Sequence, residues 1–506
     1  MKTVLVSKQG NAKTDILFVG VFKDEKKPGA IKKTEPLFAR ILEAAAKKGR
    51  FSGKSQEVFA SFQTSYRRAS EVVAIGLGDK KDLKAVTLRK IAGKIIEIAS
   101  ARKASKIRVM ADTFLGGALE ARDVAAIFTE LAGLAAYRFF RYKTKKKDEL
   151  PKFPETMELV FDDQKALKEL KPVVSRAEMI AKSVAYARDL NNEPGNVMNS
   201  SRLIEESRSL AKEKGLKCTV LGLPELKKLG MNGLLAVNQG SVTPPALIIL
   251  EHGEEHKAKG TVCLVGKGVT FDTGGISIKP SKGMEEMKFD KSGAIAVIAT
   301  LGLLADLKSP LHVVGLAPCV ENNVANDPQR PGDIIRMYNG KTVEVVNTDA
   351  EGRLILADAL SYCEKFKPVA IIDAATLTGL CHYTFGDKAC AILGTDQKLI
   401  DVIREAGEKT GERCWQLPLW DDYADAIKGN HSDINNTGDG YAGTITATMF
   451  LKEFVPAKVP WIHLDIAGTA YTAKNRYDCP KGATGFGVRL FAELLSNWNR
   501  ENCLSA

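Results

Sequence analysis

Two carboxylates and a guanidinium occupy alternate positions within one short segment, Asn347–Leu354. The carboxylates belong to Asp349 and Glu351, and Arg353 follows them. In an extended segment these three side chains would point to the same side of the backbone, so we predict that they face a common point. Carboxylates held close together repel unless a cation lies between them, and an arginine beside that cation offers a rigid fork for an anion. The segment therefore predicts a divalent-cation site, with a charged surface turn as the alternative for an isolated motif of this length.

A second segment, upstream of the first, carries further lysines and aspartates. The apolar run Thr261–Val265 leads into Gly266 and Gly268, and Asp272 and Asp290 follow. An apolar strand that ends in glycines is how an α/β sheet presents functional groups at the carboxyl ends of its strands. If both aspartates share a site with the carboxylates at 349 and 351, their negative charges need about four positive charges, which two divalent cations would supply. The sequence thus predicts a two-metal centre.

Histidine is absent from both segments. The six histidines of the chain form neither an H-E-x-x-H nor an H-x-H pattern, so a histidine-rich zinc site is not expected. A site dominated by oxygen ligands suits magnesium, manganese or zinc, and the ligand types alone do not choose among these ions.

Taken together, these motifs closely resemble the leucyl aminopeptidase (cytosol aminopeptidase) family of di-metal exopeptidases. The resemblance covers the carboxyl-terminal part of the chain and includes further segments in the family's order. These segments are Asn191–Asn196, Arg330–Asp333, Ala375–Gly379, His463–Gly468 and Lys481–Val488. The resemblance implies an enzyme that releases amino-terminal residues from peptides, with leucine and other apolar residues preferred.

The resemblance also implies two divalent metal ions per subunit, Mn²⁺ or Zn²⁺, with Mg²⁺ as an alternative at the more exchangeable position. The tightly held ion would be bound by Lys267, Asp272, Asp290 and Glu351. The exchangeable ion would be bound by Asp272, Asp349 and Glu351, with Asp349 also contributing its backbone carbonyl. A lysine must be neutral to donate a lone pair, so the first ion has to displace the proton of Lys267.

Two cationic side chains would perform the catalytic work, according to the same resemblance. Lys279 would polarise the scissile carbonyl and stabilise the oxyanion that forms. Arg353 would hold a bicarbonate ion that acts as general base toward a water activated by the metals. The free α-amine of the substrate would lie near Asp290, which restricts cleavage to the amino terminus. The implied substrate-binding residues are Lys267, Asp272, Lys279, Met287, Asp290, Thr376, Leu377, Gly379 and Ala467.

Composition places the chain among globular proteins of a reducing compartment. Its 506 residues are 44% hydrophobic, which suffices for more than one core. Nine cysteines without framework spacing indicate free thiols. Neither a signal-peptide pattern nor an uncharged apolar run of membrane-spanning length is present, and we expect a cytoplasmic protein without a membrane partner. The family resemblance implies a homohexamer whose catalytic domains meet at its centre.

A charged, proline-containing stretch divides the chain. Lys143–Glu149 is highly charged and Pro151 and Pro154 follow, a composition typical of solvated linkers. We predict an amino-terminal domain over residues 1–150, a linker over 151–175 and a catalytic domain over 176–506. Both domains are expected to be α/β, the first small and, by resemblance, macro-like. The second is larger, with a mixed, mainly parallel sheet covered by helices.

Apolar runs alternate with helical patterns along both predicted domains. The expected strands are Ile16–Phe22, Val72–Leu77, Ile107–Met110, Leu247–Leu250, Thr261–Val265, Val313–Ala317, Val369–Asp373 and Trp461–Leu464. The expected helices are Leu37–Lys48, Leu88–Ser100, Ala121–Tyr137, Ala177–Leu190, Gly293–Asp306 and Leu354–Phe366.

Three features suggest alternative functions. Residues 1–150 carry 32 Lys+Arg against 16 Asp+Glu, whereas the rest of the chain carries 41 against 45. This basic excess motivates a hypothesis of nucleic-acid binding, although a solvated lysine-rich surface is favoured because aromatic residues are sparsely interleaved. Gly76 and Gly78 resemble part of a nucleotide-binding fingerprint whose third glycine is missing. A di-metal phosphoesterase would share the carboxylates but would need histidines and groups that clamp a phosphate.

Overall fold

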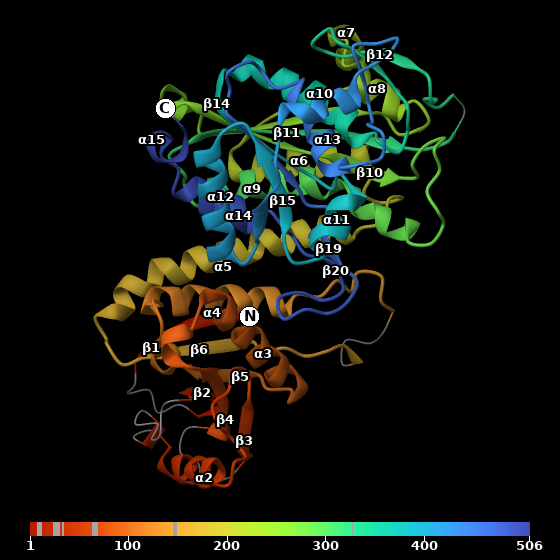
Figure 1. Cartoon of the computed structure of the whole chain (residues 1–506). Helices are drawn as coiled ribbons and strands as arrows, with labels where there is room; N and C mark the ends of the chain where they lie inside the picture. The colour runs from red at the N-terminus through yellow and green to blue at the C-terminus, as the bar shows by residue number, and fades with distance from the viewer. Residues whose placement is uncertain are drawn as a thin grey trace. The chain divides into compact units, whose positions relative to one another are not determined.

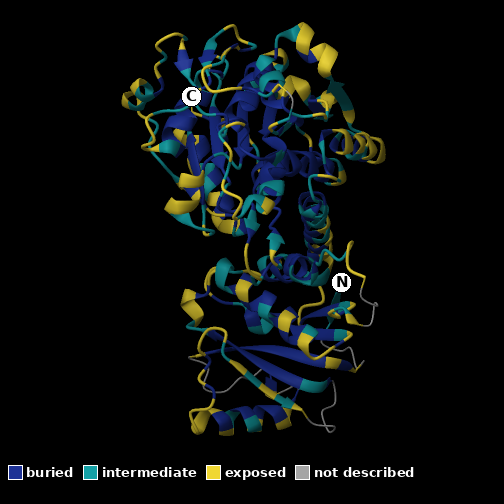
Figure 2. Cartoon of the chain, turned by 90° about the vertical axis from the view of Figure 1, so that its right-hand side faces the viewer, coloured by how far each residue is buried: buried dark blue, intermediate teal, exposed yellow. Residues whose placement is uncertain are grey.

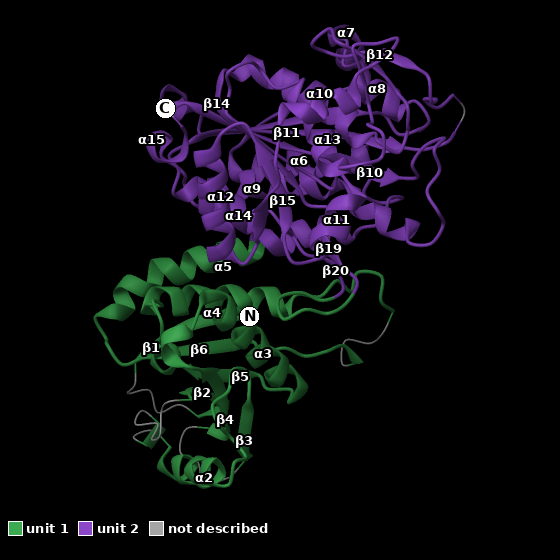
Figure 3. Cartoon of the chain, in the orientation of Figure 1, with its two compact units in different colours: residues 1–182, 474–480 green, residues 183–473, 481–506 purple. Residues whose placement is uncertain are grey.

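The chain forms two compact units, each with its own α/β sheet (Figure 3). The computed structural model describes residues 1–7, 13–23, 31–32, 35–62, 69–144, 149–325 and 327–505, so part of the charged stretch before Pro151 lies outside the described residues. The first unit comprises Met1–Lys182 and Lys474–Pro480, and the second comprises Ser183–Ala473 and Lys481–Ala506. Among the described residues, no helix is both long enough and apolar enough to cross a bilayer.

The described part of the first unit is built on a six-stranded sheet in the order β1-β6-β5-β2-β4-β3. All neighbouring strands are parallel except β3 and β4. The strands are β1 (Lys2–Ser7), β2 (Thr14–Phe22), β3 (Val58–Phe62), β4 (Ala69–Gly78), β5 (Lys106–Met110) and β6 (Thr156–Phe161). The helices include α2 (Pro36–Lys47), α3 (Ala85–Ala101) and α4 (Ala121–Ala136). The strands and helices predicted for this region are confirmed, with ends that differ by at most a few residues.

Helices cover both faces of this sheet. Along β2, Phe18 packs with α3 and α4, whereas its neighbours Leu17 and Val19 pack with α2. Successive side chains of a strand point to opposite faces, so a strand covered on both sides needs a continuous apolar run. Figure 2 shows these strands as buried and α2 with one exposed face.

The predicted linker over residues 151–175 is not a linker in the structure. Strand β6 lies within it and pairs with β1 and β5 in the first sheet. Helix α5 (Ala166–Asn192) also begins there and contains Pro172 in its interior. The sequence predicted only Ala177–Leu190 of this helix, and the structure extends it back past a proline, a residue that normally interrupts an α-helix. The first unit consequently ends at Lys182 rather than near residue 150.

Both glycines at the end of β4 have local structural reasons, because Gly78 has a φ angle of +77°, which favours glycine, and Gly76 packs against backbone. A Cβ atom on Gly76 would lie 2.0 Å from the carbonyl oxygen of Lys54 and 2.8 Å from the carbonyl carbon of Gly53. The chain's own backbone therefore occupies the space that this glycine leaves open. The short glycine pattern thus has a structural explanation that does not require a nucleotide.

The second unit contains, among its described residues, a nine-stranded mixed sheet (Figure 1). Its main path runs β16-β15-β18-β14-β9-β11-β8-β7, and β10 pairs with β11. The central strands β18, β14, β9 and β11 are parallel, with antiparallel pairs toward both edges. The strands are β7 (Lys217–Leu221), β8 (Ala246–His252), β9 (Thr261–Gly266), β10 (Gly268–Asp272), β11 (His312–Asn322), β14 (Pro368–Ala375), β15 (Cys390–Gly394), β16 (Cys414–Gln416) and β18 (Trp461–Asp465).

Helices also cover this second sheet. Helix α9 packs on β9, β11 and β14 and contacts α14, whereas α10 and α13 share a core with other residues of β9 and β11. The main helices are α6 (Ser200–Lys214), α8 (Asn232–Asn238), α9 (Ser292–Asp306), α10 (Gly352–Tyr362), α11 (Gly379–Phe385), α12 (Gln397–Thr410), α13 (Gly443–Lys452) and α14 (Val488–Ser496). The predicted two-unit α/β architecture with mixed, mainly parallel sheets is therefore confirmed.

A smaller sheet of β12 (Ile334–Arg336), β13 (Thr342–Glu344) and β17 (Ile434–Asn435) lies in the same unit. Strands β13 and β17 are parallel, with Val343 beside Ile434 and Glu344 beside Asn435. This pairing brings the residues after β17 next to the segment that leads into α10.

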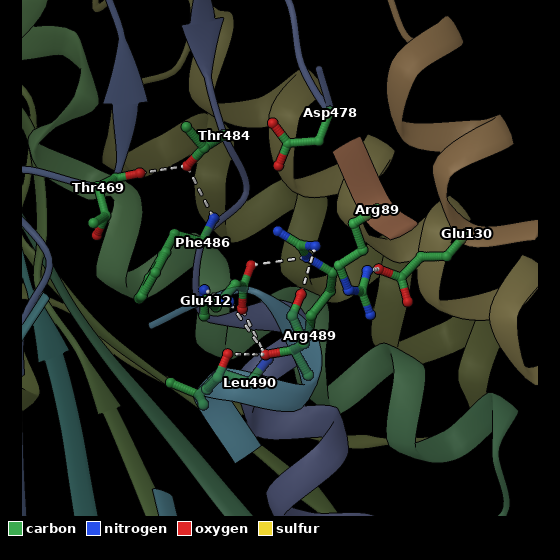
Figure 4. A network of polar contacts seen from close by, with 12 residues as sticks. Arg89, Glu130, Glu412, Thr469, Asp478, Thr484, Phe486, Arg489 and Leu490 are labelled. Atoms are coloured by element: carbon green, nitrogen blue, oxygen red, sulfur yellow. Dashed lines mark hydrogen bonds and ion pairs between the residues drawn. The ribbon is translucent and has the colours of Figure 1, made fainter. Parts of the chain in front are cut away.

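The amino terminus of α14 is held by a buried carboxylate from a distant part of the chain (Figure 4). Glu412 accepts hydrogen bonds from the backbone N–H groups of Gly487 and Leu490, at 3.1 and 2.8 Å. Arg489 donates from Nε to Glu412 at 3.1 Å and from its terminal nitrogen to the carbonyl of Thr410 at 2.9 Å. The glycine at the start of the helix has no side chain to cap it, so Glu412 satisfies N–H groups that a helix leaves free.

We predict that Glu412→Ala lowers the free energy of unfolding by about 3–5 kcal/mol, because it breaks the buried ion pair with Arg489 and removes the acceptor for two N–H groups at the start of α14. Urea or thermal unfolding would measure the loss, and Glu412→Gln, which keeps one acceptor oxygen, should cost less. As a control, Asp421→Ala removes the exposed pair with Lys452 and should cost little, because solvent screens exposed ion pairs. Equal effects at the two sites would contradict the prediction.

Candidate active site

The loops that follow the central strands bring four of the predicted residues together. Lys267 comes directly after β9, Asp272 is the last residue of β10, and Asp290 lies in the 3₁₀ segment η5 (Met284–Lys291) before α9. Glu351 directly precedes α10. Carboxylate oxygens of Asp272, Asp290 and Glu351 lie within 4.8 Å of one another, and all three residues are buried. Residues distant in sequence thus form a single acidic cluster.

Lys267 lies inside this acidic cluster, with 3% of its surface exposed. Its Nζ is 2.9 Å from Asp290 Oδ1 and 2.8 Å from Glu351 Oε1, and it donates to the carbonyl oxygen of Thr376 at 2.9 Å. Burial alone would lower the pKa of Lys267, but the charges of Asp290 and Glu351 outweigh burial and raise it. A metal ion held by the same carboxylates would have to displace this proton before the lysine could act as a ligand.

Lys279 adds a second ammonium group to the cluster. Its Nζ is 2.8 Å from Asp272 Oδ2 and also pairs with Asp349 Oδ1. Burial opposes the charged form, but the carboxylates, Asp272 first among them, raise the pKa of Lys279. The loop before it turns through Gly274 and Gly275, whose φ angles of +86° and +68° favour glycine. A Cβ on Gly274 would lie 3.0 Å from Asp349 Oδ1, so this glycine also leaves room for the carboxylate.

The carboxylates differ in their protonation tendencies. Burial raises the pKa of Asp290 well above its usual range, against the opposing effect of Lys267. Burial and the charge of Glu351 raise the pKa of Asp349 to about 7. Burial acts in the same direction on Glu351, but the neighbouring ammonium groups, Lys267 first, hold its pKa below the ordinary value. The cluster thus holds more carboxylates than its two lysines can neutralise.

Two buried oxygens of the cluster indicate that it fits metal ions. Asp290 Oδ2 and Glu351 Oε2 accept no hydrogen bond from any of the described residues. Buried polar atoms normally have a partner, and crowded buried carboxylates need compensating positive charge. Carboxylate oxygens with one lysine nitrogen are suitable donors for Mn²⁺ or Zn²⁺. The residues present therefore fit the predicted two-metal centre.

The segment that carries Arg353 is not extended beyond Ala350, so the prediction of an extended backbone through Arg353 is wrong. Glu351 already has helical backbone angles, φ −79° and ψ −37°, and α10 begins at Gly352. The guanidinium of Arg353 donates to the carbonyl oxygen of Asn436 at 2.7 Å, and its buried Nε has no hydrogen-bond partner among the described residues. Burial lowers the pKa of Arg353 to about 10, against the opposing charges of Glu351 and Asp465. The side chain therefore remains a cation with an open donor.

The predicted substrate-binding residues after β14 and β18 lie beside the cluster. Thr376 donates from Oγ1 to Asp290 Oδ1 at 2.7 Å. The backbone N–H groups of Leu377 and Ala467 both donate to Asp465 Oδ1, at 3.1 and 3.2 Å. This buried carboxylate therefore ties together the two loops that carry these residues.

The remaining two substrate-binding candidates belong to local helical segments. Gly379 is the first residue of α11, and a Cβ there would meet no atom within 4 Å. Met287 is half-buried in η5, the segment that also contains Asp290. Both residues thus belong to segments that contribute to the site, and Gly379 borders open space.

Sequence reasoning missed two residues that support the cluster. Asn322, the last residue of β11, donates from Nδ2 to Asp272 Oδ1 at 2.8 Å and to the carbonyl of Thr348 at 3.1 Å. Thr348 donates to the carbonyl of Gly274 at 2.7 Å and accepts from the backbone N–H of Ser277 at 2.8 Å. The available signal for Asn322 was its place shortly after the predicted strand Val313–Ala317, because polar residues beyond the carboxyl end of a strand often serve a site.

His463 lies in the sheet rather than in the acidic cluster. Its Nδ1 is 2.6 Å from Asp373 Oδ1 on the neighbouring strand, and Asp373 also accepts from the indole N–H of Trp461 at 2.7 Å. The candidate metal group among the described residues contains only carboxylates, in keeping with the expectation of an oxygen-dominated site.

Paired carboxylates that fit two metal ions, at the strand ends of a helix-covered sheet, define a class of hydrolases that includes aminopeptidases and phosphatases. Comparison with known proteins distinguishes between these, and the chain belongs to the cytosol aminopeptidase family. The model of the family's catalytic domain matches residues 185–492, and the model of its N-terminal domain matches residues 18–146. The expected family is thereby confirmed, and the phosphoesterase alternative loses its support.

Curated relatives match nearly the whole chain. A probable cytosol aminopeptidase of Syntrophotalea carbinolica is 43% identical over 484 residues, covering 96% of this chain and 97% of the relative. A probable cytosol aminopeptidase of Chlorobaculum tepidum is 41% identical over 509 residues, covering 98% and 99%. The solved structure of the bottromycin maturation enzyme BotP in complex with Mn is 32% identical, with a TM-score of 0.83, and the match covers 96% of this chain and 99% of that one. Family membership indicates a peptidase of the hydrolase class with aminopeptidase activity.

Proposed function

We propose that this chain is a metal-dependent aminopeptidase that removes leucine and other apolar residues from the amino termini of peptides with two divalent metal ions. The observation that carries this proposal is the buried carboxylate cluster, in which Asp290 Oδ2 and Glu351 Oε2 have no partner among the described residues. Lys267, Asp272, Asp290 and Glu351 would hold the tight ion. Asp272, Asp349 and Glu351 would hold the exchangeable one, with Mn²⁺ or Zn²⁺ expected and Mg²⁺ as an alternative at the second position.

When bound, the metal pair would supply Lewis acidity and activate water at neutral pH. The chain's own residues do the rest of the work. Lys279 remains an ammonium group and donates hydrogen bonds to the oxyanion as charge develops on the scissile carbonyl. Arg353, with its buried guanidinium and open Nε donor, would hold a bicarbonate ion, and that ion would supply a general base. Three of the four carboxylates that would hold the ions, Asp272, Asp290 and Glu351, are buried, which strengthens these electrostatic interactions.

Specificity would follow from the groups around the carboxylates. Asp290, oriented by Thr376, would receive the substrate's free α-amine, which excludes peptides with a blocked amino terminus. Met287, Leu377, Gly379 and Ala467 would border the first side chain of the substrate, and their apolar character suits leucine.

The decisive experiment is hydrolysis of leucine p-nitroanilide by metal-stripped protein supplied with manganese, zinc or magnesium. We expect metal-dependent cleavage of the free-amine substrate and none of an amino-blocked one. Lys279→Ala should reduce kcat by about 10²–10³-fold, the usual effect of removing an oxyanion donor. Lys282→Ala is the matched control, because Lys282 is an exposed lysine of the same segment. No hydrolysis with any of the three metals, or an equal loss of kcat in the two variants, would contradict the proposal.

We also propose that the enzyme works as a cytoplasmic homohexamer. Support comes from membership of a family whose name places it in the cytosol, together with the resemblance on which the assembly was predicted. Size-exclusion chromatography with light scattering should give six times the chain mass, and elution at the monomer mass would contradict the assembly.

Nucleic-acid binding through the first unit is a second candidate, motivated by the 32 Lys+Arg against 16 Asp+Glu of residues 1–150. Some of these cations are committed to buried ion pairs, such as Arg89 with Glu130 and Arg108 with Glu158. Binding that falls steeply with salt would support this candidate, and no retention of DNA at low salt would end it.

A further inference from the structure

Asn436 is a fully buried amide next to the segment that carries Asp349. It follows β17, whose parallel pairing with β13 places it opposite the residues after Glu344. The backbone N–H of Asn436 donates to the carbonyl of Glu344 at 2.9 Å, which continues this pairing. The small sheet therefore fixes the backbone of Asn436 at the start of the loop that leads to Asp349 and α10.

The side chain of Asn436 binds that loop through both ends of its amide. Its Oδ1 accepts from the backbone N–H groups of Val346 and Asn347, at 2.8 and 3.3 Å. Its Nδ2 donates to the carbonyl oxygens of Asn347 and Ala350, at 2.7 and 3.4 Å. A primary amide has two acceptor sites and two donors, so these bonds use its full capacity. Asp349 lies between the two anchored residues Asn347 and Ala350.

The backbone of Asn436 contacts the second functional group of this region. Its carbonyl oxygen accepts from the Arg353 guanidinium at 2.7 Å. One buried residue thus contacts both sides of Glu351 in the chain: the loop that carries Asp349 and the arginine on the first turn of α10. Neither contact requires Asn436 itself to touch a substrate or an ion.

We propose that Asn436 is a positioning residue that holds Asp349 and Arg353 in the arrangement required by the exchangeable metal ion and the anion beside it. This inference rests on the proposed function. Its physical basis is that the Asp349 side chain is 31% exposed, whereas the oxygens of Asp272, Asp290 and Glu351 are packed in the buried cluster. The backbone around Asp349 therefore needs an external anchor, and residues that orient metal ligands in this way commonly affect metal affinity strongly.

The chemistry of the amide makes the proposal specific. Aspartate has the shape of asparagine but no N–H to donate, so Asn436→Asp would place a carboxylate against two carbonyl oxygens and near other carboxylates. Asn436→Ala removes all four side-chain bonds but retains the backbone carbonyl that holds Arg353. Asn435→Ala is the matched control, because the side chain of Asn435 donates to the carbonyl of Lys428 at 3.2 Å, outside the loop.

The test is calorimetric titration of the full-length, metal-stripped protein with manganese chloride, for wild type and the three variants. We expect Asn436→Ala to weaken the lower-affinity binding event by about 10–100-fold and to reduce kcat in proportion, with little change in the tighter event. Asn436→Asp should weaken the same event at least as much, and Asn435→Ala should match wild type. Thermal unfolding of each protein, recorded in parallel, measures any purely structural damage.

Two outcomes would overturn the proposal. One is an Asn436→Ala protein that melts at a lower temperature but binds both manganese ions as wild type does, which would make the residue merely structural. The other is an Asn435→Ala protein that loses as much affinity as the Asn436 variants. If the alanine variant does not fold, the manganese affinity of the isosteric Asn436→Asp variant tests the proposal instead. A wild-type protein that binds two manganese ions but cleaves no aminoacyl amide would refute the proposed function. The manganese affinities of the variants would still test whether Asn436 positions the metal ligand.

Discussion

Glu351→Ala is expected to abolish the binding of both metal ions and to reduce kcat/KM by at least about 10³-fold. Glu351 is, with Asp272, one of the two carboxylates that both implied ligand sets share, and its Oε2 has no partner among the described residues. Its Oε1 lies 2.8 Å from Lys267 Nζ, so the substitution also removes a group that fixes this lysine. The metal content of the purified protein and kcat/KM on leucine p-nitroanilide would be measured together.

The isosteric Glu351→Gln separates charge from shape. It keeps the volume of the side chain but removes the negative charge that attracts a divalent ion, and we expect nearly the same loss as for alanine. Retention of two metal ions and substantial activity by the glutamine variant would show that Glu351 is not a shared ligand.

Gly352→Ala is expected to reduce kcat/KM by about 10²-fold or more, although alanine is the better helix former. A Cβ at this position would lie 2.4 Å from Cε and 2.6 Å from Nζ of Lys267. The colliding atoms are the far end of a flexible side chain, so the lysine moves more easily than the helix. Lys267 would then lose its positions beside Asp290 and Glu351, which are 2.9 and 2.8 Å away.

The prediction for Gly352 separates activity from folding. We expect circular dichroism to show an intact fold while kcat/KM and manganese affinity fall. Gly222→Ala is the control, since a Cβ there meets its nearest atom at 3.4 Å, an ordinary contact, far from the acidic cluster. Wild-type activity in Gly352→Ala would mean that Lys267 need not occupy its observed position.

The secondary structure was predictable wherever local pattern and burial agree. The apolar run at Thr261–Val265 and the helical pattern at Gly293–Asp306 became β9 and α9 almost residue for residue, because a strand or helix buried on both sides must be apolar throughout. The exception was residues 151–175. In that region β6 is short and follows two prolines, and α5 contains Pro172. The local composition therefore indicated a linker, whereas pairing with β1 and β5 makes residues 156–161 a strand.

The candidate metal-binding residues could be found from the sequence, but the residues that support them could not. Asp349 and Glu351 stand out as a charged pair beside Gly352, and Asp272 and Asp290 stand out because they follow an apolar strand that runs into glycines. Asn436 lies in no such pattern, and its importance depends on the parallel pairing of β13 and β17. Hydrogen bonds between segments almost ninety residues apart, as in the bond from Asn436 to Asn347, leave no local signal.

The sequence by itself determined the family, the α/β class of both units and the residues that could bind metal ions, because these depend on residue type, spacing and hydrophobic period. Only the tertiary structure decided that Arg353 lies on a helix, that Gly352 makes room for Lys267, and that Asp465 and Asn436 hold the loops around the cluster. These features arise from side chains of separate segments that compete for the same buried space and the same hydrogen bonds, and folding alone brings those segments together.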